Sequence, residues 1–464
     1  MVKMKRRLFI VSGVFTTAIA AAIIKQIGNE NTENYIVSIA PTIYENLDEH
    51  IRMAVKQLGV FKDLKFYFEF CLPKKNFKEE KKHVLSFNVR KFKDSIGNVE
   101  FDEIYSVYIH GAANYLFNQY PNADLYFVED GTATYLKMDN AEFINKRAKK
   151  IYTLNYFDKI TPFVTSYEGV PSVQISKEIL QDIFAFLSKN IKFQLEPKEK
   201  SIVFCAQNIS ISQIAMTYED ELKLYVNNIK KLLDLGYFVY FKEHPKTPNM
   251  FFGNLSQIIK HPNFATVGPY AVVPMETLVP YLKPCAVVSM FSSSLFTIPW
   301  LFNIPSFTFL PDKEFKDHKI FGVAHMLVST YIPPMEFIHK DVQITKNNFD
   351  LFLNSKLPIE KELFYRIKSI DFFKLFISRR EFYSIKKEIK KANKLILRSF
   401  NIPKEVLALF RSKSYLDYLC YYFKDFKVVY EDYKTRYLKL KPKKSEIFID
   451  IVKAISEIFC KVVF

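Results

Sequence analysis

The chain has 464 residues, 49% apolar and 25% charged, so it can bury one or more sizeable cores and is not a disordered polymer. Its 11 glycines include no Gly-x-Gly pair, which excludes the glycine-rich phosphate loops of P-loop NTPases, kinases and NAD-binding Rossmann enzymes. The net charge of +17 is concentrated near the C-terminal end, where residues 356–464 carry 26 Lys and Arg against 13 Asp and Glu.

The N-terminal segment allows two interpretations. Basic residues precede an apolar run from Leu8 to Ile24, as in a signal anchor, but this run of 17 residues contains polar side chains and is marginal for a hydrocarbon layer of about 30 Å. The alternative is a strand over residues 8–11, a turn at Ser12-Gly13 and a helix over 14–27. Because a second apolar strand follows at 35–39, the sequence favours this β-α-β opening.

Strands and helices continue to alternate up to about residue 310. Before residue 195 we expect strands over 65–70, 84–87, 104–109 and 124–128, and a helix over 111–119. A charged stretch containing proline, Glu196–Lys200, then breaks the pattern and indicates a linker. Beyond it we expect strands over 202–206, 237–241, 264–267, 286–289 and 306–309, and helices over 219–235, 275–282 and 294–302.

Two successive β/α runs joined by a linker predict an α/β protein of two facing, doubly wound Rossmann-like domains. The expected domains are residues 1–195, an N-terminal domain, and 200–345, a C-terminal domain. Residues 346–464 have helical spacing and no glycine, which predicts a basic helical tail. In such sheets ligands bind at the carboxyl ends of the strands, so the polar residues that follow strands are the candidate site.

The cysteines and histidines do not predict a metal site. The five cysteines are far apart, odd in number and never Cys-x-x-Cys, which argues against disulfides or a zinc knuckle and suits a reducing cytosol. The eight histidines show no ligand spacing such as His-Glu-x-x-His. We therefore expect no metal.

Two adjacent carboxylates follow the strand predicted over residues 124–128. Glu129 and Asp130 precede Gly131, which permits a sharp turn. Because neighbouring like charges raise the pKa of one group, the pair suits a general base that removes a proton from an alcohol. The same residues also suit a turn or a helix N-cap through Asp130.

A second motif, Lys242-Glu243-His244-Pro245, leaves the strand predicted over 237–241. Alternation along a strand turns Lys242 and His244 to the same side, where a fixed cation and a titratable donor can bind a phosphate. Pro245 fixes the turn that presents the imidazole. A surface histidine without a ligand is the alternative.

A serine triplet, Ser292-Ser293-Ser294, opens the helix predicted over 294–302. Hydroxyls and unpaired amides at a helix N-terminus bind anions, although the same serines also suit ordinary N-capping. Glu276, near the start of the preceding helix, can accept hydrogen bonds from ribose hydroxyls or complement the helix dipole.

In this order, the acidic, His-Pro and serine motifs resemble those of the bacterial sialyltransferases with two Rossmann domains, the GT-B type. The chain resembles the capsular alpha-2,8-polysialyltransferase family most of all. The resemblance covers about residues 100–310 and is absent from the first hundred residues and the tail. The segments that carry it are Gly131–Tyr135 (G-T-x-T-Y), Lys242–Pro245 (K-x-H-P), Pro274–Leu278 (P-x-E-x-L) and Ser292–Leu295 with Pro299.

The resemblance implies an inverting, metal-independent transfer of sialic acid from CMP-sialic acid to a hydroxyl group of a glycan, in capsule polysaccharide or lipooligosaccharide. By matching position, Asp130 or else Glu129 is the base, and His244 donates to the departing CMP phosphate. Ser293 and its neighbours bind that phosphate and Glu276 holds the ribose. CMP-sialic acid is the donor substrate, and no cofactor is implied.

The motif around His244 completes the expected donor site. Lys242 and Pro245 belong to it, because Lys242, the imidazole and helix amides together neutralise the leaving group without a cation. Transfer of another CMP-activated acidic sugar, such as Kdo, is the alternative in the same class. The alternative from another functional class is a non-catalytic module that binds a membrane surface.

The basic tail suggests where the protein works. A net charge of +13 over residues 356–464, interleaved with Phe, Tyr, Ile and Leu, suits an anionic membrane surface or an acidic glycan product, and no nucleic-acid motif is present. A helical cap packed on the first domain, with its lysines in solvent, is the other interpretation. We expect a cytoplasmic protein, peripheral at the inner face of the cytoplasmic membrane.

Overall fold

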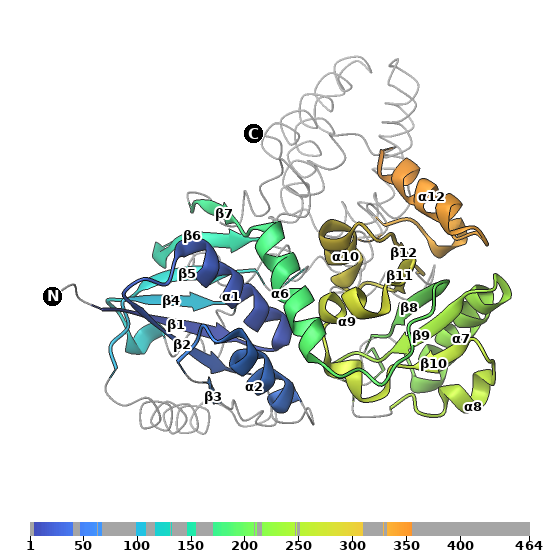
Figure 1. Ribbon diagram of the computed structural model, residues 1–464, viewed down its shortest axis with the longest axis horizontal. Helices are drawn as coiled ribbons and strands as arrows, with labels where there is room; N and C mark the ends of the chain where they lie inside the picture. The colour runs from blue at the N-terminus through green and yellow to red at the C-terminus, as the bar shows by residue number, and fades with distance from the viewer. Residues whose placement is uncertain are drawn as a thin grey trace, which may run out of the picture.

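The computed structural model describes residues 4–39, 47–62, 64–66, 99–107, 117–129, 131, 146–154, 170–207, 209–210, 216–245, 247, 251–309, 328 and 332–354. These residues form two parallel β-sheets side by side, with three helices between them (Figure 1), namely α6 (Lys177–Asn190), α9 (Met275–Leu282) and α10 (Ser294–Phe302). The predicted α/β fold of two Rossmann-like domains is confirmed.

The first sheet has seven strands in the order β3-β2-β1-β4-β5-β6-β7. They are β1 (Lys5–Val11), β2 (Thr32–Ser38), β3 (Leu64–Phe66), β4 (Glu103–Ser106), β5 (Asp124–Val128), β6 (Ala148–Thr153) and β7 (Ser172–Gln174). The helices α1 (Val14–Ile27) and α2 (Leu47–Leu58) pack against each other and against α6. The chain proceeds outward in opposite directions from β1 and from β4, so the crevice of this sheet opens at the end of β1.

The strand β1 lies in the middle of this sheet, paired with β2 on one side and β4 on the other. After it, the Thr16 hydroxyl accepts hydrogen bonds from the amides of Ser12 (2.9 Å) and Gly13 (3.1 Å), which starts α1. The side chains of β1 from Leu8 on and those of α1 from Ala18 to Ile24 are buried. The β-α-β interpretation of the N-terminus is therefore confirmed. Within the described ranges, no helix has the length and apolar character that crossing a membrane requires.

A buried ion pair ties β1 to β4 at the amino ends of the strands. The Glu103 carboxylate lies 2.9 Å from Arg7 Nε and 2.6 Å from Lys5 Nζ, and it accepts a hydrogen bond from Tyr105 (3.1 Å). Burial acts to raise the pKa of Glu103, but Lys5 and Arg7 outweigh it and the pKa lies below its usual value. Because both oxygens are paired, the buried charge is tolerated and helps to set the register of β1 on β4.

The second sheet has five parallel strands in the order β10-β9-β8-β11-β12. They are β8 (Ser201–Cys205), β9 (Phe238–Lys242), β10 (Phe264–Thr266), β11 (Ala286–Ser289) and β12 (Ser306–Thr308), joined by α7 (Tyr218–Asp234), α8 (Leu255–Ile259), α9 and α10. The crevice of this sheet lies between β8 and β11, where the order of the strands reverses.

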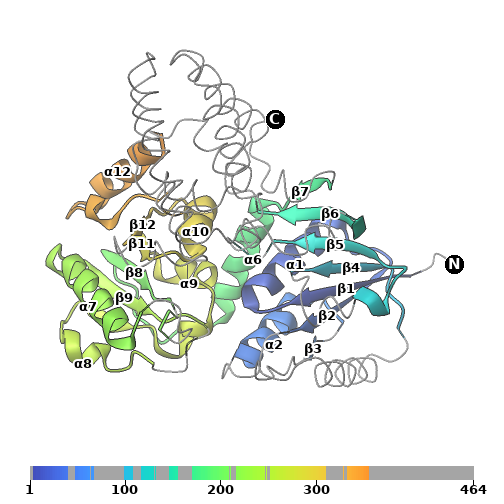
Figure 2. The same cartoon turned by 180° about the vertical axis from the view of Figure 1, so that it is seen from behind.

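The two domains share packed side chains. From α10, Leu295, Phe296 and Leu301 join the hydrophobic cluster of the first domain, and α6 packs against both α9 and α10. The view from behind shows α6 between the two sheets (Figure 2). Between α6 and β8 the chain is held by tyrosines of the second domain, because the Tyr281 hydroxyl donates to the Leu195 carbonyl (2.5 Å) and Tyr240 donates to that of Glu196.

The strands and helices that were predicted between residues 201 and 309 lie within two residues of their expected bounds, and the predicted linker runs between the two sheets. The helices α2, α6 and α8 and the strands β6 and β7 were not predicted. In α6 the signal was present, because the buried Leu180, Ile183, Phe184 and Leu187 recur at helical spacing. The strand expected over 84–87 and most of the helix expected over 111–119 fall outside the described ranges.

The predicted boundary between the second domain and the tail needs a correction. It falls inside α12 (Val342–Asn354), which begins before residue 346. Phe349 of this helix belongs to the hydrophobic cluster of the second domain and contacts the Phe307 ring, at 6.1 Å between centroids. Side-chain packing rather than charge therefore sets the end of the second domain. The remaining tail, from residue 355 on, lies outside the residues that the structure describes.

Candidate active site

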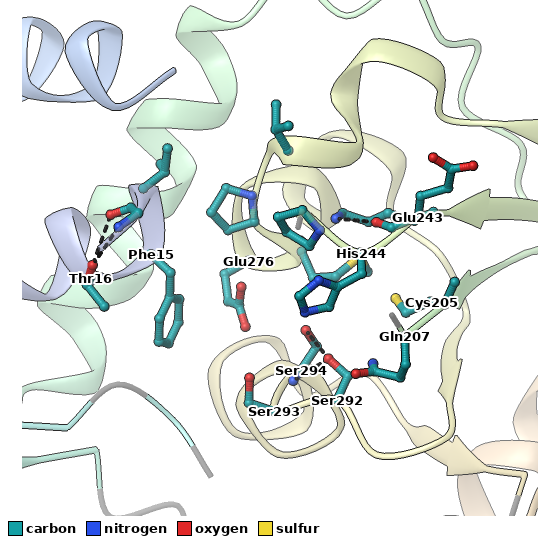
Figure 3. Close-up of a pocket in the computed structure, with 18 of the residues that line it drawn as sticks. Phe15, Thr16, Cys205, Gln207, Glu243, His244, Glu276, Ser292, Ser293 and Ser294 are labelled. Atoms are coloured by element: carbon teal, nitrogen blue, oxygen red, sulfur yellow. Dashed lines mark hydrogen bonds between the residues drawn. The ribbon is translucent and has the colours of Figure 1, made fainter. Parts of the chain in front are cut away.

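A cavity of about 380 Å³ lies where the two crevices meet. Its wall on the first domain is the turn that follows β1. Its wall on the second domain consists of the segments that follow β8, β9 and β11, together with the start of α9. The lining segments are 12–16, 205–207, 242–245, 272, 274–276 and 292–294. In Figure 3 His244, Glu276 and the three serines gather around one space.

His244 and Pro245 line this cavity at the end of β9, as the sequence predicts. Lys242 also lines it, but its side chain is only 3% exposed, and its ammonium group donates to the carbonyl oxygen of Ala271 at 2.5 Å. Burial lowers the pKa of Lys242, although the charge of Glu276 acts in the opposite direction. The predicted cation is therefore buried in the wall of the cavity and held by the main chain of another segment.

Glu243, which lies between Lys242 and His244 in the chain, and Cys205, which pairs with Lys242 across the sheet, have other roles. The Glu243 carboxylate accepts a hydrogen bond from the Phe252 amide (2.7 Å) and points away from the serines (Figure 3). It thereby anchors the chain that follows the His-Pro motif. Cys205 lines the cavity, but burial raises the pKa of its thiol to about 12. A thiol that stays protonated is a poor nucleophile, so Cys205 forms part of the cavity wall and has no chemical role.

Glu276 is the second residue of α9 and lines the cavity from a nearly buried position. Its carboxylate accepts a hydrogen bond from the hydroxyl of Thr297 on α10. Burial raises the pKa of Glu276, and the Thr297 hydroxyl and the Lys242 charge offset this only in part. A desolvated carboxylate with one fixed partner is well suited to accept further hydrogen bonds from ligand hydroxyls.

The serines of the triplet make different contacts. The Ser292 hydroxyl accepts from the Ser294 amide (3.2 Å) and donates to the Ser294 hydroxyl (3.2 Å), so it shapes the turn before α10. The Ser293 side chain makes no capping bond to the helix, although Ser293 is the N-cap residue. Ser292 therefore stabilises the turn, and the Ser293 hydroxyl is not used to cap α10.

In the acidic motif the structure describes Glu129 and Gly131, while Asp130 lies outside the described residues. Glu129 is fully buried, accepts a hydrogen bond from the Leu154 amide (2.7 Å) and does not line the cavity. It therefore links the ends of β5 and β6. Gly131 has φ +117°, and a Cβ atom there would lie 3.2 Å from Ser293 Cβ. The acidic loop and the serine triplet meet across the two domains at this glycine.

Replacing Gly131 by alanine should lower turnover by about tenfold, because the new methyl group pushes the acidic loop away from Ser293. Initial rates at saturating substrate, with unfolding temperatures alongside, measure the effect. The matched control is Gly59→Ala, since Gly59 also has positive φ (+64°) but has nothing within 4 Å of an added Cβ. Equal turnover of the two variants would mean that the close approach to Ser293 has no role.

The first-domain wall and the segment after β8 were not predicted as parts of the site. Phe15 stands at the domain interface (Figure 3), with its ring stacked on Phe184 of α6 at 5.9 Å. Gln207 follows β8 and is almost buried at the back of the cavity. The signal that could have found both is topological: each follows a strand beside the point where its sheet reverses order. Neither position carries a recognisable motif.

The sequence of the chain matches one known protein family. Residues 7–311 match the family described as Alpha-2,8-polysialyltransferase (POLYST). No curated protein sequence matches the chain at a significant level.

Several solved structures resemble the chain at low sequence identity. MurG of Acinetobacter baumannii is 9% identical, with a TM-score of 0.41 and coverage of 76% of this chain and 96% of that one. A UDP-GlcNAc 2-epimerase of Methanocaldococcus jannaschii is 10% identical, with a TM-score of 0.45 and coverage of 76% and 93%. The ADP-heptose heptosyltransferase II of E. coli is 13% identical, with a TM-score of 0.36 and coverage of 76% and 99%.

Proposed function

Because the chain belongs to the alpha-2,8-polysialyltransferase family and is a glycosyltransferase, we propose that it transfers sialic acid from CMP-sialic acid to a hydroxyl group of a glycan. The predicted family is confirmed. The predicted extent was too short, since the match begins at residue 7 rather than near residue 100. The first domain as well as the second therefore belongs to the family's sequence pattern.

The observation that carries the proposal is the meeting of separate motifs on one cavity. His244, Glu276 and Ser293 come from three different segments of the second domain, and Gly131 of the acidic motif lies against Ser293 from the first. A volume of about 380 Å³ is within the range of sites that enclose a small ligand. The site therefore combines an anion-binding helix end, a titratable donor and a hydroxyl-binding carboxylate.

The proposed reaction is a single displacement that inverts the anomeric carbon. Asp130 takes the proton of the acceptor hydroxyl as its oxygen bonds to the anomeric carbon, and the bond from that carbon to the phosphate oxygen breaks. His244 donates to the departing CMP phosphate, which the Ser293 hydroxyl binds at the N-terminus of α10. Glu276 binds the ribose hydroxyls. We place the acceptor in capsule polysaccharide or lipooligosaccharide.

No metal ion is required in this scheme. The charge that develops on the phosphate is met by His244, by the N-terminus of α10 and by Lys242 beneath them. These groups are held by the fold before the substrate binds, so they need little rearrangement during the reaction.

The test is to incubate purified protein with CMP-sialic acid and a panel of glycan acceptors, in the presence of EDTA, and to weigh the products. We expect CMP release and acceptors enlarged by one or more sialyl residues, at a rate that EDTA does not change. Transfer only from other CMP-activated sugars would overturn the proposed donor. Loss of activity in EDTA would overturn the metal-independent scheme but not the donor.

We also propose that the basic tail holds the enzyme on the cytoplasmic face of an anionic membrane. Each basic residue near such a surface contributes about 1 kcal/mol, so five engaged side chains out of the 26 Lys and Arg after residue 355 suffice for association. Cosedimentation with phosphatidylglycerol vesicles should weaken as salt rises, because the Debye length falls from about 10 Å at 0.1 M to about 3 Å at 1 M. Equal binding to neutral vesicles would contradict the proposal.

A further inference from the structure

Gln207 is a nearly buried polar side chain on the second-domain wall that the function proposed above does not use. Cys205 pairs with Lys242 on β9 and with Ser289 on β11, so Gln207, two residues further, lies level with His244 and next to the serine triplet. Its side chain is 8% exposed and lines the cavity. Figure 3 shows it beside Ser292 and below His244. Gln207 thus stands between the two motifs assigned to the phosphate.

The orientation of the Gln207 amide follows from its one side-chain partner. Its Nε2 donates to Ser289 Oγ at 3.3 Å, and the Ser289 hydroxyl donates its own hydrogen to the Cys205 carbonyl at 2.9 Å. A serine hydroxyl has a single hydrogen, so Ser289 can only accept from Gln207. The nitrogen of the amide must therefore face Ser289, and the oxygen, Oε1, is left as an acceptor with no partner among the described residues.

Hydrogen bonds also fix the main chain of Gln207. Its amide donates to the Tyr225 hydroxyl at 2.9 Å, and that hydroxyl donates to the buried Glu221 carboxylate at 2.5 Å. Glu221 also accepts from the Ser210 amide (2.9 Å) in the same loop. These contacts come from α7, away from the cavity, so the position of Gln207 does not depend on a ligand. A polar atom held in this way is suited to select a ligand group.

We propose that Gln207 Oε1 accepts a hydrogen bond from an N–H or O–H group of the donor substrate next to the phosphate. A carbonyl oxygen cannot donate to a phosphate oxygen, so the partner is a hydroxyl, amide or amine group carried by the nucleoside or by the transferred sugar. The inference rests on the proposed CMP-sialic acid donor. It makes Gln207 a residue that distinguishes this donor from analogues lacking the group, which would leave a nearly buried acceptor without a partner.

The test compares binding of two probes, CMP and the 3-fluoro derivative of CMP-sialic acid, by titration calorimetry. Gln207→Leu keeps the size of the side chain and removes the acceptor, so we expect about a tenfold loss of affinity for the fluoro donor. An equal loss for CMP assigns the partner to the nucleoside, and unchanged CMP binding assigns it to the sugar. The matched control, Gln257→Leu, changes an exposed glutamine of α8 and should alter neither affinity.

A second variant keeps the test valid if the first does not fold. Ser289→Ala leaves the ligand-facing atoms in place but frees the amide of Gln207 to turn over, and should weaken the fluoro donor about threefold. Wild-type affinity of both variants for both probes, with unchanged unfolding temperatures, would overturn the inference and leave the proposed function intact. If the wild-type protein binds neither probe, the proposed donor itself is wrong.

Discussion

Replacing His244 by alanine should lower turnover by about a hundredfold or more, the scale of a lost general acid. The imidazole lines the cavity beside the serine triplet, where it is placed to donate to the leaving phosphate (Figure 3). Because a small side chain replaces one at the surface of a cavity, the unfolding temperature should change little. Asp130→Asn should have a similar effect on turnover, since an amide cannot take the proton of the acceptor hydroxyl.

The matched control is His261→Ala, which removes an exposed histidine that follows α8 and does not line the cavity. Its turnover should equal that of the wild type. Rates are compared at saturating donor, with the unfolding temperature of each variant. Near-normal turnover of His244→Ala would remove the histidine from the mechanism and leave Ser293, the N-terminus of α10 and Lys242 to meet the charge of the phosphate.

Deleting residues 1–27 should abolish folding of the first domain and give insoluble protein. The deletion removes β1, the strand that joins β2 to β4, together with α1, which packs on α2 and α6. The strands β2 and β4 would lose the strand with which both pair, and many backbone hydrogen bonds would be lost with it. A soluble and active truncation would contradict the structural role of this segment.

A point substitution in α1 tests the structural role of the same segment with a smaller change. Ile23 of α1 is fully buried, and a carboxylate there has no partner, so Ile23→Asp should cost several kcal/mol of unfolding free energy and leave most of the protein unfolded. The neighbouring Lys25 is exposed on the same helix, and Lys25→Gln should cost less than about 1 kcal/mol. Urea unfolding followed by circular dichroism measures both.

Local patterns account for the elements that were predicted well. The strand β11 and the helices α9 and α10 have the predicted bounds, because each is a short apolar run between residues that end it. The left-handed residues Lys283 and Asn303 stop the two helices. Elements with weaker local signals were missed, such as β6, whose second and third residues are exposed lysines, and β7, which has three residues.

In the site, too, the local features were predicted and the roles that depend on tertiary contacts were not. The residue types and spacing of the His-Pro motif, the serine triplet and the carboxylates at 129, 130 and 276 are local features, and the order of these motifs along the chain was enough to predict the family. Their individual roles were harder to separate. Lys242 and Glu129 are both polar residues at strand ends, but each turned out to be buried and bonded to the main chain of another segment.

The sequence by itself determined the α/β class, the central β-α-β unit at the N-terminus and the motifs, because hydrophobic period, turn residues and short motifs act over a few residues. Only the tertiary structure decided which of these residues meet. Gly131 contacts Ser293 because α6 packs the two domains together, and Gln207 faces the cavity because β8 lies between β9 and β11. Such contacts join residues more than 30 positions apart, so they depend on strand order and domain packing, which no local pattern encodes.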